Sequence, residues 1–219
     1  MRRISAGDQA TARFGQEMVN DRSIVVLRRR DLPEDTESLA GFLVGKSLVC
    51  ETAGGRISGR IVETEAYPPG DAAGHSFRGL TRSNHSLFLE RGHAYVYFAY
   101  GSSYMMNVSA ERAGVGAGVL LRAVEPLEGI PLMERRRNTE KLHDLCRGPG
   151  RLTQSFGIDR SLDGLDLCRE GPLWLGSAAG PTGVVDRSVR IGITREKERL
   201  LRFYERGSPY LSGPLRLRA

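Results

Sequence analysis

Long apolar segments and cysteines are both scarce in this sequence. No apolar run approaches the roughly 20 residues needed to cross a bilayer, and no apolar stretch follows the basic start at residues 1–5, so we expect neither a membrane partner nor a secretory signal. The three cysteines, Cys50, Cys146 and Cys168, have no CxxC spacing, which argues against a disulfide framework and a zinc knuckle. The sequence therefore predicts an intracellular protein with reduced thiols, located in the cytoplasm or nucleoid if the source is bacterial.

Lysine is equally scarce, although the chain is basic. Of the 32 basic residues only Lys46, Lys141 and Lys197 are lysines, and the net charge is +6 with a pI of about 9.5. The guanidinium group of arginine is a planar fork that matches phosphate oxygens, and a basic surface favours a polyanionic partner such as nucleic acid. Codon bias can also make a protein rich in arginine, so the charge alone does not identify the binding partner.

The chain is organised as one domain behind a short arm. Its 219 residues suit a single domain. Residues 1–22 are polar and without period, which predicts a flexible N-terminal arm and leaves residues 23–219 as the folded domain. Strand-like segments fill the middle of the chain and helical segments lie at its edges, which is typical of an α+β fold built on a curved antiparallel or mixed β-sheet.

Turn and cap residues set the expected element boundaries. Asp31, with Pro33 inside the first turn, predicts a helix start, and Gly45 predicts its end. The glycine pair at 54–55 predicts a hairpin turn. The other expected elements are strands at 47–51, 56–67, 93–100, 104–110, 118–124, 187–193 and 201–205, and helices at 127–137 and 148–156.

Two carboxylates interrupt an apolar strand in the middle of the chain. Strict alternation puts Ile61 on the same face as Glu63 and Glu65, and it puts Val62 on the opposite face, which is used for packing. Burying a carboxylate is costly unless it is paired or used, so the glutamates indicate either a functional site or a solvated outer face. Arg122, alone in another apolar strand, needs an acidic partner, and these two glutamates are the natural candidates.

Tyrosines and one amide stand out in the neighbouring strands. Tyr97 shares a strand face with Tyr95, and Tyr100 ends the strand beside a glycine turn, where an aromatic ring is a candidate wedge between stacked bases. Tyrosines also favour strands for structural reasons. Asn107 interrupts the next apolar strand, where an amide can read a base edge or satisfy backbone groups.

The histidines give no strong metal signature. None of the four has HExxH spacing. A zinc site built from His75, His85 and His93 is a weak alternative, and we expect no metal and no other cofactor.

Short blocks of sequence carry a family resemblance. They are RIVETEAY at 60–67, AGHS at 73–76, YVYFAYG at 95–101, MNV at 106–108, LLRAVEP at 120–126, GPGRL at 148–152 and RFYERGSP at 202–209. In this order and spacing they resemble the alkyladenine (3-methyladenine) DNA glycosylase family. The resemblance implies an α+β domain with a curved sheet, a protruding β-hairpin and surrounding helices, similar to the formyltransferase C-terminal-domain-like fold.

The resemblance also implies catalytic and base-binding roles. Glu65 corresponds to the general base that activates water, and Arg122 and His75 correspond to groups that position that water or the target nucleotide. Tyr67 and Tyr97, together with His75, correspond to the aromatic walls that enclose a flipped base.

Further roles concern the DNA. Tyr100 corresponds to the side chain that fills the gap left in the duplex, and Asn107 to the residue that disfavours the exocyclic amino group of guanine. Arg151, in the first turn of the expected helix at 148–156, is a candidate phosphate contact. Two departures alter the DNA contacts without touching the water-activating residues: Ser83 stands where the family often has arginine, and Ser103 where it often has an aromatic.

The implied function is monofunctional base-excision repair. The enzyme would act as a monomer on double-stranded DNA that contains damaged purines, with water as co-substrate, and would leave an abasic site. No lysine lies from Ile61 to Thr139, so this region lacks the amine that a lyase needs for a Schiff base. A non-catalytic nucleic-acid-binding module on the same scaffold is the alternative. A carbohydrate hydrolase is disfavoured, because two carboxylates on one strand cannot flank a bond from opposite sides.

Overall fold

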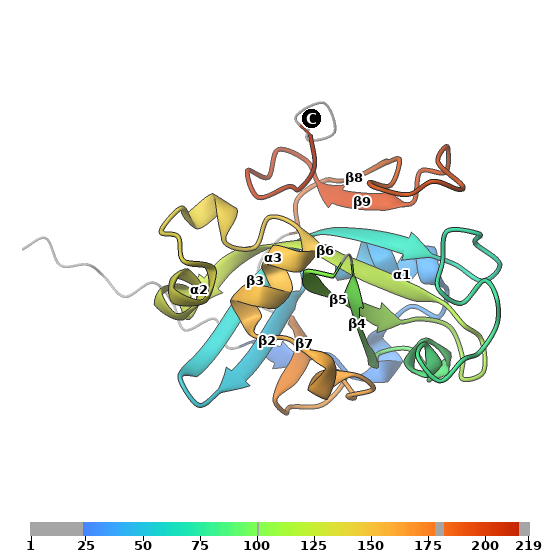
Figure 1. Cartoon of the computed structure of the whole chain (residues 1–219), viewed down its shortest axis with the longest axis horizontal. Coiled ribbons are helices and arrows are strands. Elements are labelled where there is room, and N and C mark those ends of the chain that lie inside the picture. Colours follow the sequence, from blue (N-terminus) through green and yellow to red (C-terminus); the bar gives the residue numbers. More distant parts are fainter. Residues whose placement is uncertain (1–23, 100, 178–181, 215–219) are drawn as a thin grey trace, which may run out of the picture.

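The computed structural model of the chain describes residues 24–99, 101–177 and 182–214 (Figure 1). The expected N-terminal arm at residues 1–22 lies outside the described residues, and so does Tyr100. The division into an arm and a glycosylase domain therefore stays a prediction.

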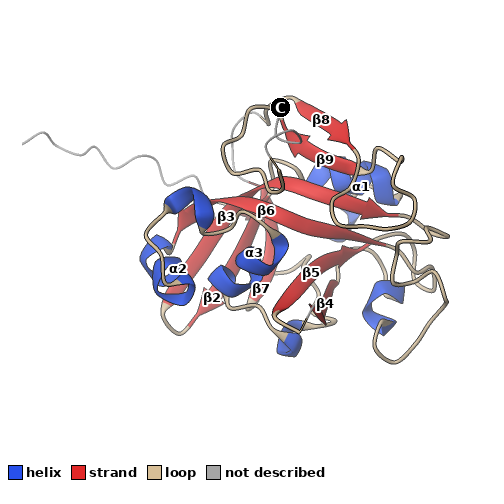
Figure 2. Cartoon of the chain, turned by 45° about the horizontal axis from the view of Figure 1, so that its top comes forward, coloured by secondary structure: helices blue, strands red, loops and turns tan. Residues whose placement is uncertain are grey.

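The described part of the chain forms a sheet with short helices around it (Figure 2). Its strands are β1 (Val25–Val26), β2 (Ser47–Thr52), β3 (Gly55–Tyr67), β4 (Ala94–Ala99), β5 (Ser103–Ser109), β6 (Gly118–Glu128), β7 (Leu173–Ser177), β8 (Val185–Ser188) and β9 (Arg202–Glu205). Its α-helices are α1 (Thr36–Leu43), α2 (Ile130–Arg137) and α3 (Pro149–Phe156), and its 3-10 helices are η1 (Arg29–Asp31), η2 (His85–Phe88), η3 (Leu142–Asp144) and η4 (Arg160–Leu162).

All strand pairs within the described residues are antiparallel. The strands follow the order β1-β7-β2-β3-β6-β5-β4, and β9 joins β3 and β8 off this path. The long strands β3 and β6 pair along almost their whole length at the centre (Figure 2). The α+β class is confirmed, with the antiparallel form of the sheet rather than the mixed one. The expected hairpins at β2–β3 and β4–β5 are both present.

The centre of β3 is irregular, and this irregularity positions the site. Its first half pairs with β2, whereas Glu63 and Glu65 pair with β9 on the same edge. The ladder to β6 has bulges between Ile61 and Thr64. As a result Ile61 joins the main core, while Val62 packs in a second cluster with the Tyr204 ring. The predicted placement of Ile61 on the face of Glu63 and Glu65, and of Val62 on the main packing face, is therefore wrong, because a β-bulge re-aims the side chains beside it.

Three expected boundaries also change. The first helix begins at Thr36, because the Asp35 carboxylate caps it by accepting the Ser38 N–H at 2.9 Å, whereas Asp31 ends the preceding 3-10 turn. The expected helix at 127–137 begins at Ile130, because its first residues extend β6. The expected strand at 187–193 ends at Ser188, and the chain beyond it turns towards β3.

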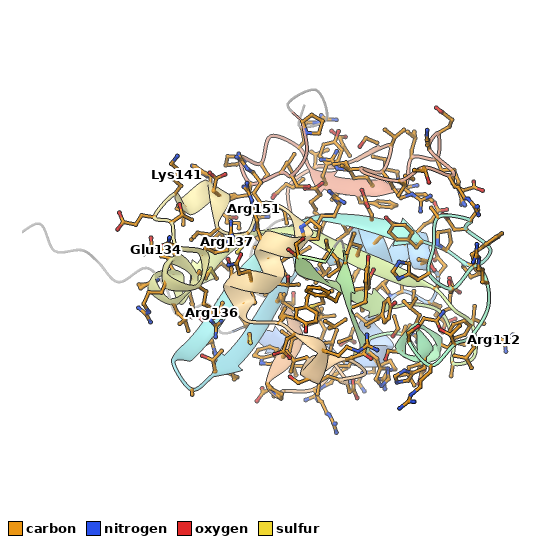
Figure 3. The ribbon with its side chains drawn as sticks, viewed as in Figure 1. Arg112, Glu134, Arg136, Arg137, Lys141 and Arg151 are labelled. Atoms are coloured by element: carbon orange, nitrogen blue, oxygen red, sulfur yellow. The ribbon has the colours of Figure 1, made fainter. Side chains whose placement is uncertain are left out.

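The core and the basic surface occupy different parts of the fold. Leu39 and Leu43 of α1, Leu121 of β6 and Phe156 of α3 are fully buried in the main core. Arginines of α2 and α3 gather on one side of the molecule, where Figure 3 labels Arg136, Arg137 and Arg151. No helix among the described residues has the length and apolar character to cross a membrane.

Candidate active site

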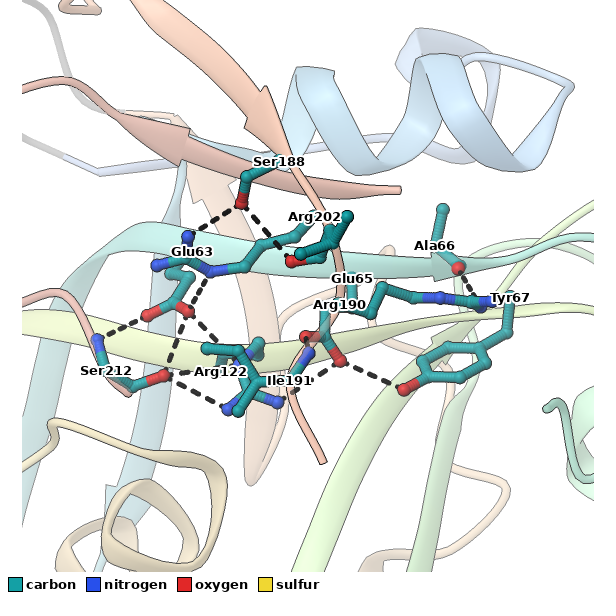
Figure 4. Close-up of polar contacts among 11 residues, drawn as sticks. Glu63, Glu65, Ala66, Tyr67, Arg122, Ser188, Arg190, Ile191, Arg202 and Ser212 are labelled. Atoms are coloured by element: carbon teal, nitrogen blue, oxygen red, sulfur yellow. Dashed lines mark hydrogen bonds and ion pairs between the residues drawn. The ribbon is translucent and has the colours of Figure 1, made fainter. Parts of the chain in front are cut away.

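A buried carboxylate–guanidinium cluster lies where β3 and β6 pair (Figure 4). The side chains of Glu63 and Glu65 on β3 are both fully buried, and Arg122 reaches them from β6. Its Nε lies 3.1 Å from Glu63 Oε1, and its Nη1 lies 3.2 Å from Glu65 Oε2. The expected pairing of Arg122 with these glutamates is confirmed. The alternative, that the glutamates lie on a solvated outer face of the strand, is excluded because both side chains are fully buried.

Glu63 is held by four hydrogen-bond donors. Its Oε1 accepts hydrogen bonds from Arg122, from Arg202 Nε at 2.7 Å and from the Ser212 hydroxyl at 2.9 Å. Its Oε2 accepts the Ser212 N–H at 2.6 Å. Four donors, two of them guanidinium groups, thus hold this carboxylate. Burial by itself would raise the pKa of Glu63, but the two arginines hold it below the ordinary value.

Glu65 is held by three donors. The Tyr67 hydroxyl donates to Oε2 at 2.9 Å, Arg122 donates to the same oxygen, and the Ile191 N–H donates to Oε1 at 2.7 Å. Among the described residues no fourth donor reaches it, so one of its roughly four lone-pair positions is left, on Oε1. Burial raises the pKa of Glu65 above its ordinary value, and Arg122 opposes this only in part. A carboxylate with a raised pKa and a spare acceptor position is suited to take a proton.

A cavity of about 290 Å³ opens beside this cluster. Its size is at the lower end of small-ligand pockets, about 300–1,000 Å³, which suits a single base. Tyr67 connects the two features, because its ring lines the cavity while its hydroxyl is bonded to Glu65. The predicted base-pocket residues that the structure brings together in the lining are Tyr67, His75, Tyr97 and Asn107.

Aromatic rings form one wall of the cavity. The His75 and Tyr97 rings lie 4.3 Å apart between centroids, and Tyr95 stacks on Tyr97 at 5.2 Å. His75 Nδ1 lies 2.9 Å from the Tyr95 hydroxyl, which fixes the orientation of the imidazole ring. Desolvation lowers the pKa of His75, which favours its neutral form. Asn107 is buried in the same lining, and its Nδ2 donates to the Tyr95 carbonyl at 3.4 Å.

Sequence reasoning missed several residues of this site. Tyr95 was detectable, because it alternates with Tyr97 along one strand. Ile191 and Ser212 contribute backbone N–H groups, which no residue type can signal. Arg202 falls inside a matching block, RFYERGSP, but its ion pair with Glu63 depends on β9 pairing with β3.

Of the other predicted site residues that the structure describes, Glu65, Arg122 and Arg151 do not line the cavity. Arg151 is exposed on α3, where its Nη1 lies 3.2 Å from the Asp144 carboxylate. It does lie near the β4–β5 hairpin, since a Cβ on the adjacent Gly150 would meet Ser103 at 2.8 Å. Tyr100 lies between β4 and β5 in the sequence and is outside the described residues. Among the described residues no group of three or more His, Cys, Asp or Glu side chains is arranged to hold a metal ion.

Comparison with known proteins agrees with this architecture. Residues 30–209 match the model of the methylpurine-DNA glycosylase family. A protein of Mesorhizobium japonicum is 61% identical over 188 residues, which cover 86% of this chain and 90% of that protein. A protein of Paraburkholderia phytofirmans is 55% identical over 194 residues, covering 89% and 91%. Both relatives bear the provisional name 3-methyladenine DNA glycosylase.

These matches define the class of protein. That class is DNA glycosylase, and in this chain its fold is an antiparallel sheet with a cavity beside a buried carboxylate–guanidinium cluster. The chain belongs to the methylpurine-DNA glycosylase family, which confirms the resemblance inferred from the sequence.

Proposed function

We propose that the protein is a monofunctional glycosylase that takes an alkylated or otherwise modified purine of double-stranded DNA into the cavity and hydrolyses its N-glycosidic bond. Glu65 activates the water, and the product is an abasic site. The observation that carries the proposal is the Glu65 carboxylate, which is fully buried, bonded through Tyr67 to the cavity wall, and left with one acceptor position.

Access to the bond requires base flipping. Inside a duplex the sugar C1′ is shielded, and extruding the nucleotide costs a few kcal/mol, less when the base is damaged. Tyr100, in the turn that joins β4 and β5, is proposed to offset this cost by stacking in the gap that the base leaves.

Selection then takes place in the cavity. Tyr67, Tyr97 and His75 would enclose the base, and the negative π faces of the tyrosines attract a purine that carries positive charge. That charge also makes the purine a good leaving group, because it departs as a neutral molecule. Asn107 is proposed to disfavour guanine by crowding its exocyclic amino group.

The chemical step uses the spare acceptor position of Glu65. As the C1′–N bond lengthens, its electron pair leaves with the purine and the sugar gains oxocarbenium character. The oxygen of water bonds to C1′, and one water proton passes to Glu65. Positioned base catalysis contributes a rate factor of roughly 10²–10⁴, and Arg122 holds the carboxylate in place. Glu63, whose pKa two arginines hold below the ordinary value, stays ionised and takes no proton, which gives the two glutamates different roles.

Excision from defined lesions tests this function directly. Duplexes that carry a single 3-methyladenine, 7-methylguanine, hypoxanthine or ethenoadenine are incubated with the wild-type protein, and abasic sites are revealed as alkali-labile breaks. We expect breaks at the lesion and none in undamaged duplex. Glu65→Gln is expected to keep damaged-DNA binding and to lose excision.

Two outcomes would change the interpretation. Binding without breaks in the wild-type protein would favour a non-catalytic nucleic-acid-binding module on the same scaffold. Turnover in Glu65→Gln close to that of the wild type would remove Glu65 as the base while leaving the glycosylase class intact.

A further inference from the structure

A second buried ion pair lies behind the Tyr67 ring and takes no part in the proposed chemistry. The Arg190 side chain is fully buried, and its Nη1 lies 2.7 Å from Asp71 Oδ2 and donates to the Ala66 carbonyl at 2.9 Å. Arg199 Nη1 approaches the same Asp71 oxygen at 3.5 Å from the surface. The buried charge of Arg190 is thus compensated on one side of its guanidinium group.

The other side of that group faces an aromatic ring. The Arg190 guanidinium carbon lies 4.6 Å from the centroid of the Tyr67 ring (Figure 4). Its Nε and Nη2 are buried and have no hydrogen-bond acceptor among the described residues. The guanidinium group therefore meets the π electrons of Tyr67 in the geometry of a cation–π contact.

This contact leaves only part of the ring for a ligand. Arg190 covers one face of Tyr67 and is absent from the residues that line the cavity. A base in the cavity must therefore meet the opposite face or the edge of the same ring. A cation behind the ring makes the opposite face less negative, and the surrounding low dielectric preserves this effect.

We propose that the Arg190–Asp71 ion pair determines how strongly the aromatic ring of Tyr67 prefers a cationic purine over a neutral one. The inference rests on the proposed function, because it concerns the base that the cavity accepts. Arg190 weakens the attraction of the ring for cationic lesions, and so keeps neutral lesions competitive. Asp71 limits this effect by compensating part of the arginine charge.

Two substitutions separate this electrostatic role from a structural one. Arg190→Met and Asp71→Asn break the same ion pair, but they change the charge behind the ring in opposite directions. The readout is the ratio of single-turnover excision rates for 7-methylguanine, which is cationic, and hypoxanthine, which is neutral, in otherwise identical duplexes.

The expected shifts have opposite signs. Arg190→Met should raise the ratio and Asp71→Asn should lower it, each by about three- to tenfold, the range of a partly desolvated cation–π contact. Arg190→Lys, which keeps the positive charge, is the matched control and should leave the ratio close to that of the wild type.

A purely structural role predicts a different pattern. Equal losses on both lesions in both variants, or ratios that move in the same direction, would overturn the inference. If Arg190→Met does not fold, as judged by thermal unfolding, Asp71→Asn decides, because its ratio must fall. Failure of the proposed function is distinguishable, since the wild-type protein would then excise neither lesion.

Discussion

Glu63 and Glu65 lie two positions apart on one strand, both fully buried, yet their pKa values are shifted in opposite directions. For Glu63 two arginines outweigh burial, and four donors hold its oxygens. For Glu65 burial prevails, and an acceptor position is left. Two neighbouring carboxylates whose pKa values are shifted in opposite directions by their surroundings indicate a division of roles. Here the roles are structural support for Glu63 and proton transfer for Glu65.

The first prediction is that substitutions of the two glutamates have different effects on the stability of the fold. Removing one partner of a buried ion pair costs about 3–5 kcal/mol, so Glu63→Gln should lower the free energy of unfolding by about this amount. Glu65→Gln should lower it less, because burial already disfavours the ionised form of Glu65. Urea denaturation measures both variants. Equal losses would contradict the division, as would normal stability of Glu63→Gln.

The second prediction concerns pH. Glu65 must be ionised to accept a proton, and its pKa is raised by burial from the ordinary 4.5. Excision should therefore fall as pH decreases through that raised pKa, at a higher pH than an ordinary glutamate would give. The measurement is the single-turnover rate on 7-methylguanine across pH. A rate that stays flat down to pH 4.5 would contradict the assignment of Glu65.

Unfolding is the control for this pH profile. The pKa of Glu63 is lowered in the folded state, so its stabilising contribution is present above the unfolded pKa and is lost only as pH falls through the folded one. Unfolding caused by protonation of Glu63 should thus begin at a lower pH than the loss of excision. Circular dichroism at each pH separates the two effects.

The sequence predicted those parts of the site that depend on residue type and strand period. Glu63 and Glu65 alternate along β3, and a lone arginine in an apolar strand requires an acid, so the pairing with Arg122 followed from burial energetics. The bulge that re-aims Ile61 and Val62 could not be predicted, because it arises from how β6 pairs with β3.

The rest of the site depends on contacts between distant parts of the chain. The Ile191 N–H reaches Glu65 across 126 positions, and the Ser212 N–H reaches Glu63 across 149. Both donors are backbone groups, which every residue except proline has. Ile191 lies in the segment after β8 and Ser212 in the segment after β9, and only the course of these segments brings the two N–H groups to the carboxylates. The first segment replaces the end of the strand that was expected at 187–193.

The third prediction is that borohydride traps no covalent enzyme–DNA adduct. A lyase forms a Schiff base through an amine, and Lys46, which directly precedes β2, packs over the Phe42 ring. Lys197 is the lysine closest in sequence to a cavity residue, two positions after Arg195. The test is denaturing electrophoresis after reduction in the presence of lesion DNA. An adduct that disappears in Lys197→Met would assign lyase chemistry to that residue.

The fourth prediction is that Arg151 contributes to the salt dependence of DNA binding. Each phosphate contact adds about 0.9 to the slope of log affinity against log salt concentration. Arg151 is exposed on α3 near the β4–β5 hairpin, but it shares its charge with Asp144. Arg151→Ala should therefore flatten the slope by less than one full contact. Fluorescence anisotropy of labelled duplex at several salt concentrations measures it.

Two further variants make this measurement specific to the Arg151 surface. Arg112 is exposed and lies on the opposite side of the molecule from Arg151 (Figure 3), so Arg112→Ala should leave the slope unchanged although it removes the same charge. Asp144→Asn should steepen the slope, because it releases both Arg147 and Arg151 from their shared carboxylate. If Arg151→Ala and Arg112→Ala give the same slope, net charge alone governs binding, and α3 does not contact the phosphate backbone.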